Sequence, residues 1–190
     1  MIVMGAHASI RHARVEDAEA IAAVHVAAWR ESYTDLVPAE MLASLSVDER
    51  ADRWRRILGE PDPAIATVAF IACVPDGAVM GFGSCGLQRS AELAGAGFGG
   101  EFQAIYVLRA AQRRGIGRAL MGAMARNLAD RSLQGGALWV LEGNLPALNF
   151  YDMLGGVVVA QRENRRGKGA VLAEIAYGWA SVASLAMAAP

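Results

Sequence analysis

The chain has 190 residues, of which 54% are hydrophobic and 19% are charged, and its formal net charge is −1. This length suits one domain, which we predict to span residues 1–190, with a core at about 9–177 and an apolar tail at 178–190. The composition excludes a disordered tail and a polybasic nucleic-acid binder, and no apolar run approaches the roughly 20 residues of a membrane helix. We therefore predict neither a nucleic-acid nor a membrane partner.

The N-terminus and the cysteines bear on the compartment. The first residues, MIVMGAHAS, lack a basic segment followed by a long apolar core, so we expect no secretory signal. Cys73 and Cys85 fall on two strands of a predicted hairpin, Cys73 facing roughly Met80 and Cys85 facing roughly Val68. They are then about 15 Å apart at ~3.3 Å per residue, too far for a disulfide. We predict a cytoplasmic protein with reduced cysteines.

The first half of the chain combines helices and strands. Acidic Glu16 and Asp17 suit the start of a helix, and Ser46 with Glu49 forms a capping box for another. Asp76-Gly77 marks the turn of a hairpin. The predicted elements are a strand at 9–14, a helix at 16–33, a short helix after Pro38, a helix from 46 to 58, and strands at 66–74 and 79–87.

The second half alternates strands and helices. Its Gly-rich start, residues 88–100, has no period and is predicted to be a mobile loop. The predicted elements after it are a strand at 101–108, a helix at 115–130, a strand at 137–142, a helix from Asn144 to Leu154, and strands at 157–160 and 171–177 across a basic turn at 162–169. The strand–helix–strand unit requires a parallel strand pair. The predicted fold class is therefore α/β, with a mixed central sheet of about seven strands flanked by helices.

The turn Gln112-Arg113-Arg114-Gly115-Ile116-Gly117 joins a strand to a helix and predicts an anion site. A helix start offers unpaired N–H groups and a partial positive charge. Arg109 and Arg118 add charge on either side, although a solvated basic helix start is the alternative for each arginine. The dinucleotide fingerprint needs a third glycine where Leu120 stands, and a Walker loop needs Gly-Lys-Ser/Thr. The turn suits phosphates but neither of those classes.

Two motifs carry a specific resemblance. Gln112-x-x-Gly115-x-Gly117, after a strand ending Ile105-Tyr106-Val107, resembles the acyl-CoA signature of the GNAT superfamily of N-acetyltransferases. The run from Leu141 to Gly155, LEGNLPALNFYDMLG, is similar to the second signature of that superfamily. One departure is Arg109, where many members have proline. Together with the order of elements, the resemblance covers most of residues 9–177.

The resemblance implies that acetyl-CoA binds between two splayed central parallel strands. The backbone of Ile105 and Val107 is then expected to pair with the pantetheine amides, and Asn144 to supply an amide to the same arm. Helix capping is the alternative role for Asn144. The implied cofactor-binding residues are Ile105, Tyr106, Val107, Gln112, Arg113, Arg114, Gly115, Ile116, Gly117, Arg118, Asn144, Ala147 and Phe150.

Acyl transfer to an amine requires one proton to leave the substrate ammonium and another to reach the departing thiolate. Tyr151 matches the general acid of the superfamily, although it also lies on an apolar stripe where a structural tyrosine looks the same. Glu101, which begins the central strand, is the candidate base, and an exposed edge carboxylate is its alternative. By the same resemblance, the Val107 N–H is the candidate oxyanion donor.

The sequence indicates the acceptor site less clearly than the cofactor site. Trp29 and Tyr33 on the first helix are candidates to wall it, and core packing is the alternative. His7, His12 and His25 form no plausible metal-ligand set, so no metal is predicted. The predicted function is transfer of acetyl from acetyl-CoA to a small-molecule or peptide primary amine by direct attack in a ternary complex. The alternative is a non-catalytic acyl-CoA sensor or interaction module, and the apolar tail suggests a homodimer contact.

Overall fold

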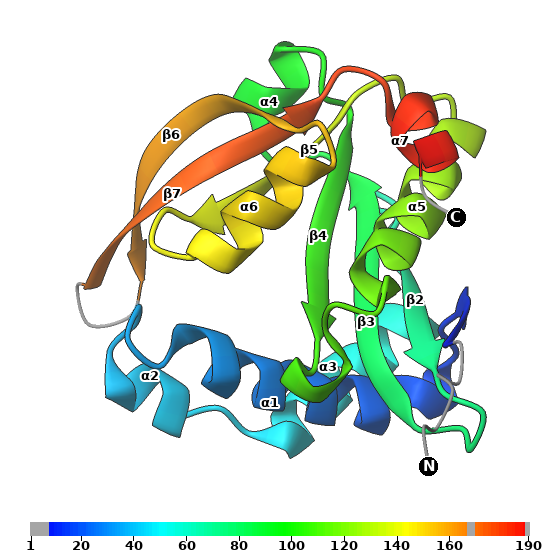
Figure 1. The fold of residues 1–190 in the computed structure, drawn as a ribbon, viewed down its shortest axis with the longest axis vertical. Helices are drawn as coiled ribbons and strands as arrows, with labels where there is room; N and C mark the ends of the chain where they lie inside the picture. The colour runs from blue at the N-terminus through cyan, green and yellow to red at the C-terminus, as the bar shows by residue number, and fades with distance from the viewer. Residues whose placement is uncertain (1–7, 167–169, 189–190) are drawn as a thin grey trace.

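The computed structural model describes residues 8–166 and 170–188. They form a seven-stranded sheet in the order β1-β2-β3-β4-β5-β7-β6, flanked by helices, so the predicted fold class is confirmed (Figure 1). The strands are β1 (Ser9–His12), β2 (Val68–Cys73), β3 (Val79–Leu87), β4 (Gly100–Val107), β5 (Gly136–Leu141), β6 (Val157–Arg166) and β7 (Ala170–Trp179). The α-helices are α1 (Ala18–Tyr33), α2 (Ala39–Ala43), α3 (Val47–Gly59), α4 (Ala91–Gly95), α5 (Ile116–Asp130), α6 (Leu145–Met153) and α7 (Val182–Ala188), with 3₁₀ turns η1 (Val15–Asp17) and η2 (Arg109–Ala111).

The sheet opens between its two central parallel strands. Strands β1 to β4 form one antiparallel half, and β5, β7 and β6 form the other. β4 and β5 meet only at Gly100↔Gly136 and Glu101↔Ala137. Beyond this pair the strands diverge, as the resemblance implied, and the facing edge of β4 has no ladder partner in β5.

Two apolar layers cover the sheet because side chains alternate along each strand. On β2, Ala69 and Ile71 join the core beneath α1 and α3, whereas Phe70 and Ala72 join the core beneath α5 and α7. Alternation on β4 sends Tyr106 toward the α1 side and Ile105 toward the α5 side. The central strand thus presents different side chains to the two sides of its open edge.

Side-chain caps fix the starts of two predicted helices. The Ser46 hydroxyl accepts a hydrogen bond from the Glu49 N–H at 3.3 Å and starts α3. The side-chain oxygen Oδ1 of Asn144 accepts from the Ala147 N–H at 3.3 Å and starts α6, with Pro146 in its first turn. Both helix starts lie where the sequence predicts them.

The prediction of a structureless loop at 88–100 is wrong in its middle. Residues 91–95 form α4, started by Ser90, whose hydroxyl accepts from the Leu93 N–H. Leu93 is only 1% exposed and packs against β5 and β7 residues. A single buried leucine in a five-residue helix produces no period that a sequence pattern can register.

The last hairpin is longer than predicted. The predicted basic turn at 162–169 is strand through Arg166, and its residues 167–169 lie outside the described part of the chain. Arg162 stands opposite Glu174 in the register, so cross-strand charge pairing stabilises the extension. In the predicted tail, α7 packs Val182 and Leu185 against the core beneath α5. Residues 189–190 of that tail, and residues 1–7 with the predicted absence of a signal peptide, also lie outside the described residues.

The cysteine register is nearly as predicted. Cys85 pairs with Val68, whereas a bulge after Ala72 places Cys73 opposite Val79 instead of Met80. Both cysteines are free and buried. Across residues 8–166 and 170–188, no helix combines the length and apolarity that crossing a membrane demands.

Candidate functional site

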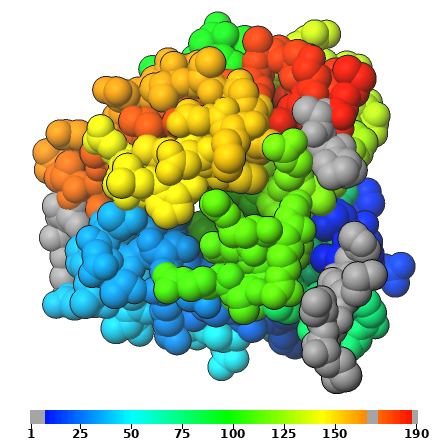
Figure 2. All heavy atoms as spheres, in the orientation of Figure 1, coloured from blue at the N-terminus to red at the C-terminus, as the bar shows by residue number. Residues whose placement is uncertain are grey.

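A cleft of about 1160 Å³ occupies the opening between β4 and β5. Its lining comes mainly from α1, α3, β4, β5, the turn before α5, α6 and β7. In the space-filling view the hollow lies where the blue α1 and α2 region, the yellow α6 and the green segment around the turn meet (Figure 2). The splayed strands therefore hold a large concave site, of the kind in which ligands usually bind.

The turn before α5 has the backbone of an anion site. Gly115 precedes the helix with a φ of +81°, a conformation that glycine adopts without strain, and Arg113 has a φ of +62°. Left-handed residues within such a turn are the backbone feature that directs successive N–H groups toward one anion. The Gln112 amide donates to the Val107 carbonyl at 3.0 Å and ties the turn to the end of β4.

Only some of the predicted cofactor-binding residues of the turn line the cleft. Gln112, Arg113, Gly115, Gly117 and Arg118 line the cleft. Ile116 and Arg114 do not: the side chain of Ile116 packs in the core beneath α5, and that of Arg114 is exposed.

Gly117 lets α5 approach α6 closely. A Cβ added there would lie 3.2 Å from the Phe150 ring, tighter than ordinary van der Waals contact. Phe150 and Ala147 both line the cleft from α6, together with Asn144, which is 8% exposed. The helix start and the second signature motif thus meet at one wall.

Tyr151 belongs to both the cleft and the core. It lines the cleft, yet it is 6% exposed and its ring packs 5.5 Å from that of Tyr177. Burial raises the pKa of its hydroxyl above the ordinary tyrosine value. It is therefore a protonated phenol at neutral pH, as a proton donor must be.

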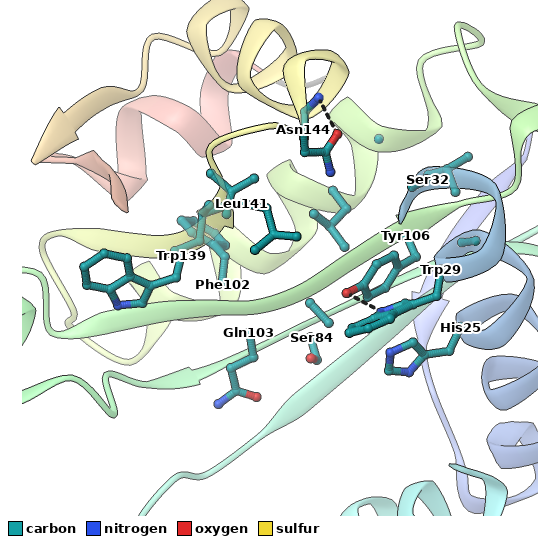
Figure 3. A pocket seen from close by; sticks show the side chains of 18 of the residues that line it. His25, Trp29, Ser32, Ser84, Phe102, Gln103, Tyr106, Trp139, Leu141 and Asn144 are labelled. Carbon is teal, nitrogen blue, oxygen red and sulfur yellow. Dashed lines mark hydrogen bonds between the residues drawn. The ribbon is translucent and has the colours of Figure 1, made fainter. Parts of the chain in front are cut away.

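An aromatic cluster forms the α1 side of the cleft. Trp29 Nε1 donates to the Tyr106 hydroxyl at 2.8 Å (Figure 3). The Tyr33 ring centroid lies 4.9 Å from that of Trp29. His25 stacks on Tyr106 at 4.9 Å. Desolvation, with smaller effects from Arg50 and Arg53, lowers the pKa of His25 to about 3. The cluster is uncharged, and Trp29 and Tyr33 line the cleft while packing against other aromatic rings.

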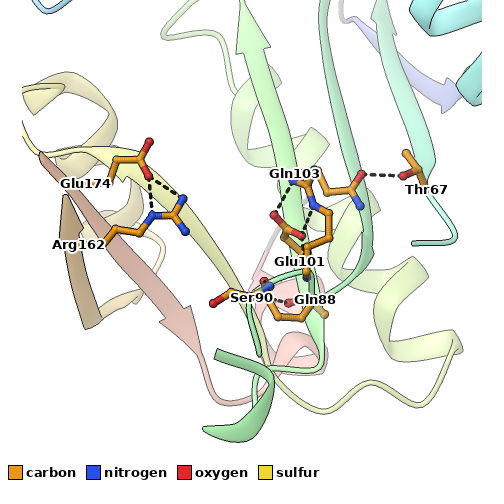
Figure 4. Close-up of polar contacts among 9 residues, drawn as sticks. Thr67, Gln88, Ser90, Glu101, Gln103, Arg162 and Glu174 are labelled. Carbon is orange, nitrogen blue, oxygen red and sulfur yellow. Dashed lines mark hydrogen bonds and ion pairs between the residues drawn. The ribbon is translucent and has the colours of Figure 1, made fainter. Parts of the chain in front are cut away.

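Glu101 is kept apart from these residues. It is 6% exposed and does not line the cleft. Arg89 donates to both of its carboxylate oxygens at 2.7 Å, and the Arg89 N–H donates to one of them at 3.2 Å (Figure 4). It lies where β4 and β5 are still paired, before the opening begins. This geometry favours a structural ion pair over the predicted base. The alternative, an exposed carboxylate, is wrong because Glu101 is buried.

Arg109, the departure from the family pattern, contacts α1. Its backbone N–H donates to the Glu31 carboxylate at 2.8 Å, and its guanidinium donates to the Glu31 carbonyl at 2.6 Å. A proline at this position has neither donor. The turn of the candidate anion site is therefore bonded to the helix that carries Trp29.

Sequence reasoning missed several lining residues. Arg50 and Arg53 line the cleft from α3. Their spacing of three residues, next to Trp54 and Ile57, places them on one face of the helix, and a helical-wheel plot of the sequence shows this. Trp139 and Glu174 line it from β5 and β7. Glu174 is 5% exposed and accepts from Arg162 at 2.8 Å, and no motif marks it in the sequence.

No group of three His, Cys, Asp or Glu side chains suited to a metal ion occurs within 8–166 and 170–188. His7 of the considered histidine set lies outside those ranges.

With this geometry established, comparison with known proteins identifies the family. The sequence model of the acetyltransferase (GNAT) family matches residues 23–156, which span both signature motifs. The chain belongs to the GNAT family. An uncharacterised N-acetyltransferase of Bacillus subtilis, YuaI, is 35% identical over 179 residues, which are 93% of this chain and 95% of the relative. The predicted family and enzyme class, an acetyltransferase, are confirmed.

Solved GNAT structures share the fold. A GCN5-related N-acetyltransferase from Rhodopseudomonas palustris superposes with a TM-score of 0.69 at 20% identity, covering 95% of this chain and 99% of that one. The acetyltransferase yncA of Salmonella typhimurium, solved with its cofactor acetyl-CoA, gives a TM-score of 0.65 at 18% identity, covering 91% and 93%. Acetyl-CoA, the predicted cofactor, is thus the cofactor of a GNAT structural relative.

Proposed function

We propose that this GNAT protein transfers an acetyl group from acetyl-CoA to a primary amine by direct attack within a ternary complex. One observation carries the proposal: a single cleft is lined by the anion-type turn, by Tyr151 and by the aromatic cluster. Donor and acceptor sites that share one cleft bring two reactants together without a covalent enzyme intermediate. Positioning of this kind supplies up to roughly 7–11 kcal/mol of the barrier reduction.

The residues on the donor side fit acetyl-CoA. Arg113 and Arg118 line the cleft beside the N–H groups of the turn, which suit the pyrophosphate. The edge of β4 that lacks a β5 partner suits the pantetheine amides, as an added strand does. For Arg114 and Ile116 we propose a contribution of the backbone N–H alone, because the Ile116 side chain packs in the core and the Arg114 side chain is exposed outside the cleft. When bound, acetyl-CoA supplies an acyl group activated as a thioester.

Tyr151 is the proposed proton donor to the departing thiolate. The backbone N–H of Val107, which lines the same cleft, is the proposed donor to the acyl oxygen. Trp29 and Tyr33 are proposed to hold the acceptor on the α1 side. Each group acts on a reactant in the cleft, so no nucleophilic side chain is required.

No side chain is assigned as the base. Glu101 is engaged by Arg89 and does not line the cleft. The acceptor then reacts through its uncharged fraction, which for an amine with a pKa near ~10 rises tenfold per pH unit up to that pKa. We expect turnover to follow this rise.

The test is acetyl-CoA-dependent thiol release across a panel of primary amines, with cofactor binding measured by calorimetry. We expect CoA binding, turnover with some amines, and an acetylated amine by mass spectrometry. Tight CoA binding with no turnover on any amine would favour the sensor function. The cytoplasmic location stays a prediction, which fractionation of the source cell tests.

A further inference from the structure

The most unusual charges of the cleft lie on α3. Among the described lining residues, six are arginines and three are acidic. Two of those charges are already neutralised, Arg89 by Glu101 and Glu174 by Arg162. Arg113 and Arg118 belong to the turn proposed for the cofactor. The excess of positive charge on the acceptor side therefore comes from the arginines of α3, chiefly Arg50 and Arg53.

Arg50 is a half-buried cation that has no ion-pair partner among the described residues. Within the described parts of the chain, no carboxylate oxygen lies within 4 Å of the guanidinium of Arg50 or Arg53. Desolvation, followed by repulsion from Arg53, lowers the pKa of Arg50, so its charge is held against an electrostatic cost. Its guanidinium carbon lies 5.8 Å from the centroid of the Trp29 ring. A charge kept at such a cost commonly marks a site that a ligand completes.

The space beside Arg50 continues beyond the main cleft. A second cavity of about 370 Å³ between α2 and α3 is also lined by Trp29, Arg50 and Arg53. His25, which is 9% exposed, lines the main cleft near them, and its buried Nδ1 has no hydrogen-bond partner in the described residues. Figure 3 shows His25, Trp29 and Tyr106 gathered at one end of the cleft, away from Trp139. Two arginines, an indole and an unsatisfied imidazole therefore surround one region.

We propose that Arg50 and Arg53, beside Trp29, bind a carboxylate of the acceptor, so that the preferred acceptor is a small amine that also carries a carboxylate, such as an amino acid. This inference rests on the proposed function and names its substrate class. An arginine binds a carboxylate through two parallel hydrogen bonds, and a partly desolvated site strengthens them. The uncharged His25 adds no competing positive charge. Three acidic residues line these two spaces near the α3 arginines, and all three are exposed: Glu49 lines the second cavity, and Glu60 and Asp62 line the main cleft. Asp62 already accepts from the Ala64 N–H at 2.9 Å.

The experiment compares acids with their amides. L-phenylalanine, L-leucine and γ-aminobutyrate are each paired with the corresponding primary amide, and thiol release is measured for every compound. For the two α-amino acids, the amino group of the amide has a lower pKa than that of the acid, so a larger fraction of it is uncharged and able to react. This difference favours the amide, so a measured preference for the acid cannot come from it. We expect at least one acid to be preferred about tenfold or more over its amide in kcat/KM.

Variants locate the preference. Arg50→Gln and Arg53→Gln are expected to raise KM about tenfold for the acids, to leave the amides unchanged, and to leave KM for acetyl-CoA unchanged. Arg55→Gln is the matched control, because Arg55 lies on the same helix, pairs with Glu19 and Asp52, and does not line the cleft. Calorimetric titration of each acid into the CoA-bound protein gives a second readout that needs no turnover.

Three results overturn the inference. They are equal use of acids and amides by the wild type, loss of both forms together in Arg50→Gln, and a KM rise for acetyl-CoA alone, which assigns these arginines to the cofactor. In each case the wild-type protein still acetylates amines, so the proposed function survives. If no amine reacts, the titration decides: Arg50-dependent binding of acids supports the carboxylate site, and its absence removes it.

Discussion

At the residue scale, Tyr151 has a packing role and a proposed chemical one, and the two are separable by experiment. Tyr151→Phe keeps the ring and removes only the hydroxyl. Because a general acid contributes roughly 10²–10⁴-fold, we expect kcat to fall by at least about 100-fold. Burial raises the pKa of the hydroxyl, so wild-type turnover should show no alkaline decline below the ordinary tyrosine value of about 10. Steady-state kinetics across pH measure both effects.

Tyr177→Phe is the matched control for that substitution. Tyr177 packs against Tyr151, donates to Asp152 at 2.8 Å and does not line the cleft. It should lose about 1 kcal/mol of stability and keep its kcat. If both variants lose activity equally, the effect comes from packing and Tyr151 is not the acid.

Glu101 is expected to stabilise the fold rather than to accept a proton. Glu101→Gln and Arg89→Gln each break the same ion pair, so each should lower the free energy of unfolding, by about 1–3 kcal/mol after discounting for the half-exposed arginine. Chemical denaturation measures this loss, and neither variant should change the shape of the pH–rate profile. If the acidic limb of the pH–rate profile disappears in Glu101→Gln but remains in Arg89→Gln, Glu101 is the general base after all.

His25 predicts an acid-sensitive stability. Its pKa of about 3 in the folded state is below the unfolded value near 6.5, since desolvation opposes its charge. As the pH falls below 6.5, the unfolded chain binds a proton that the folded one does not, so stability declines toward pH 3, by up to roughly 4 kcal/mol. Chemical denaturation should show a smaller decline for His25→Phe than for the wild type. His12→Gln, at an exposed position on β1, should retain the wild-type decline.

The sequence located most of these residues but not their partners. Tyr151 and Asn144 followed from a motif, and the structure places them at the cleft as that motif requires. The pairing of Glu101 depends on Arg89, which lies in the irregular segment after β3 and leaves no periodic signal. Arg50 acquires its meaning only when α3 packs beside α1, a tertiary fact that no local pattern contains.

At the scale of elements, the contact between Arg109 of η2 and Glu31 of α1 allows a direct test of whether the turn proposed for the cofactor positions the helix proposed to hold the acceptor. Arg109→Ala removes the guanidinium contact to Glu31, and Arg109→Pro also removes the backbone donor. Each lost hydrogen bond costs about 0.5–1.5 kcal/mol. We expect KM for the acceptor to rise severalfold, more in the proline variant than in the alanine one. An unchanged KM in both variants would mean that core packing alone positions α1.

Elements with a long repeating sequence pattern are predicted more accurately than elements with a short one. Long amphipathic helices and the hairpin β2–β3 lie close to their predicted bounds, because several turns or residues repeat one signal. The sequence does not predict α4, because a single leucine anchors it. It predicts too short a strand for β6, because the charged residues of that strand resemble a loop. In the structure, the oppositely charged Arg162 and Glu174 face each other across β6 and β7, so the charged residues belong to a strand pair.

At the scale of the whole molecule, α7 closes one face of the core. Leu185 is 3% exposed beneath α5, whereas Met187 on the same helix is 83% exposed. Leu185→Ala should cost about 2–5 kcal/mol and Met187→Ala less than about 0.5 kcal/mol, measured by chemical denaturation. Similar losses in both would mean that α7 is not docked in solution. The homodimer stays a prediction, which light scattering on the full chain tests.

The open seam between β4 and β5 also makes the sheet incomplete by itself. Backbone donors and acceptors along β4 face a gap, and such groups need a partner. Whatever fills the gap therefore contributes to the free energy of unfolding, and at 100 times its dissociation constant a ligand adds about 2.7 kcal/mol. The melting temperature of this protein then reports occupancy of its own seam. A thermal screen thereby becomes a route to its ligands that requires no assay of turnover.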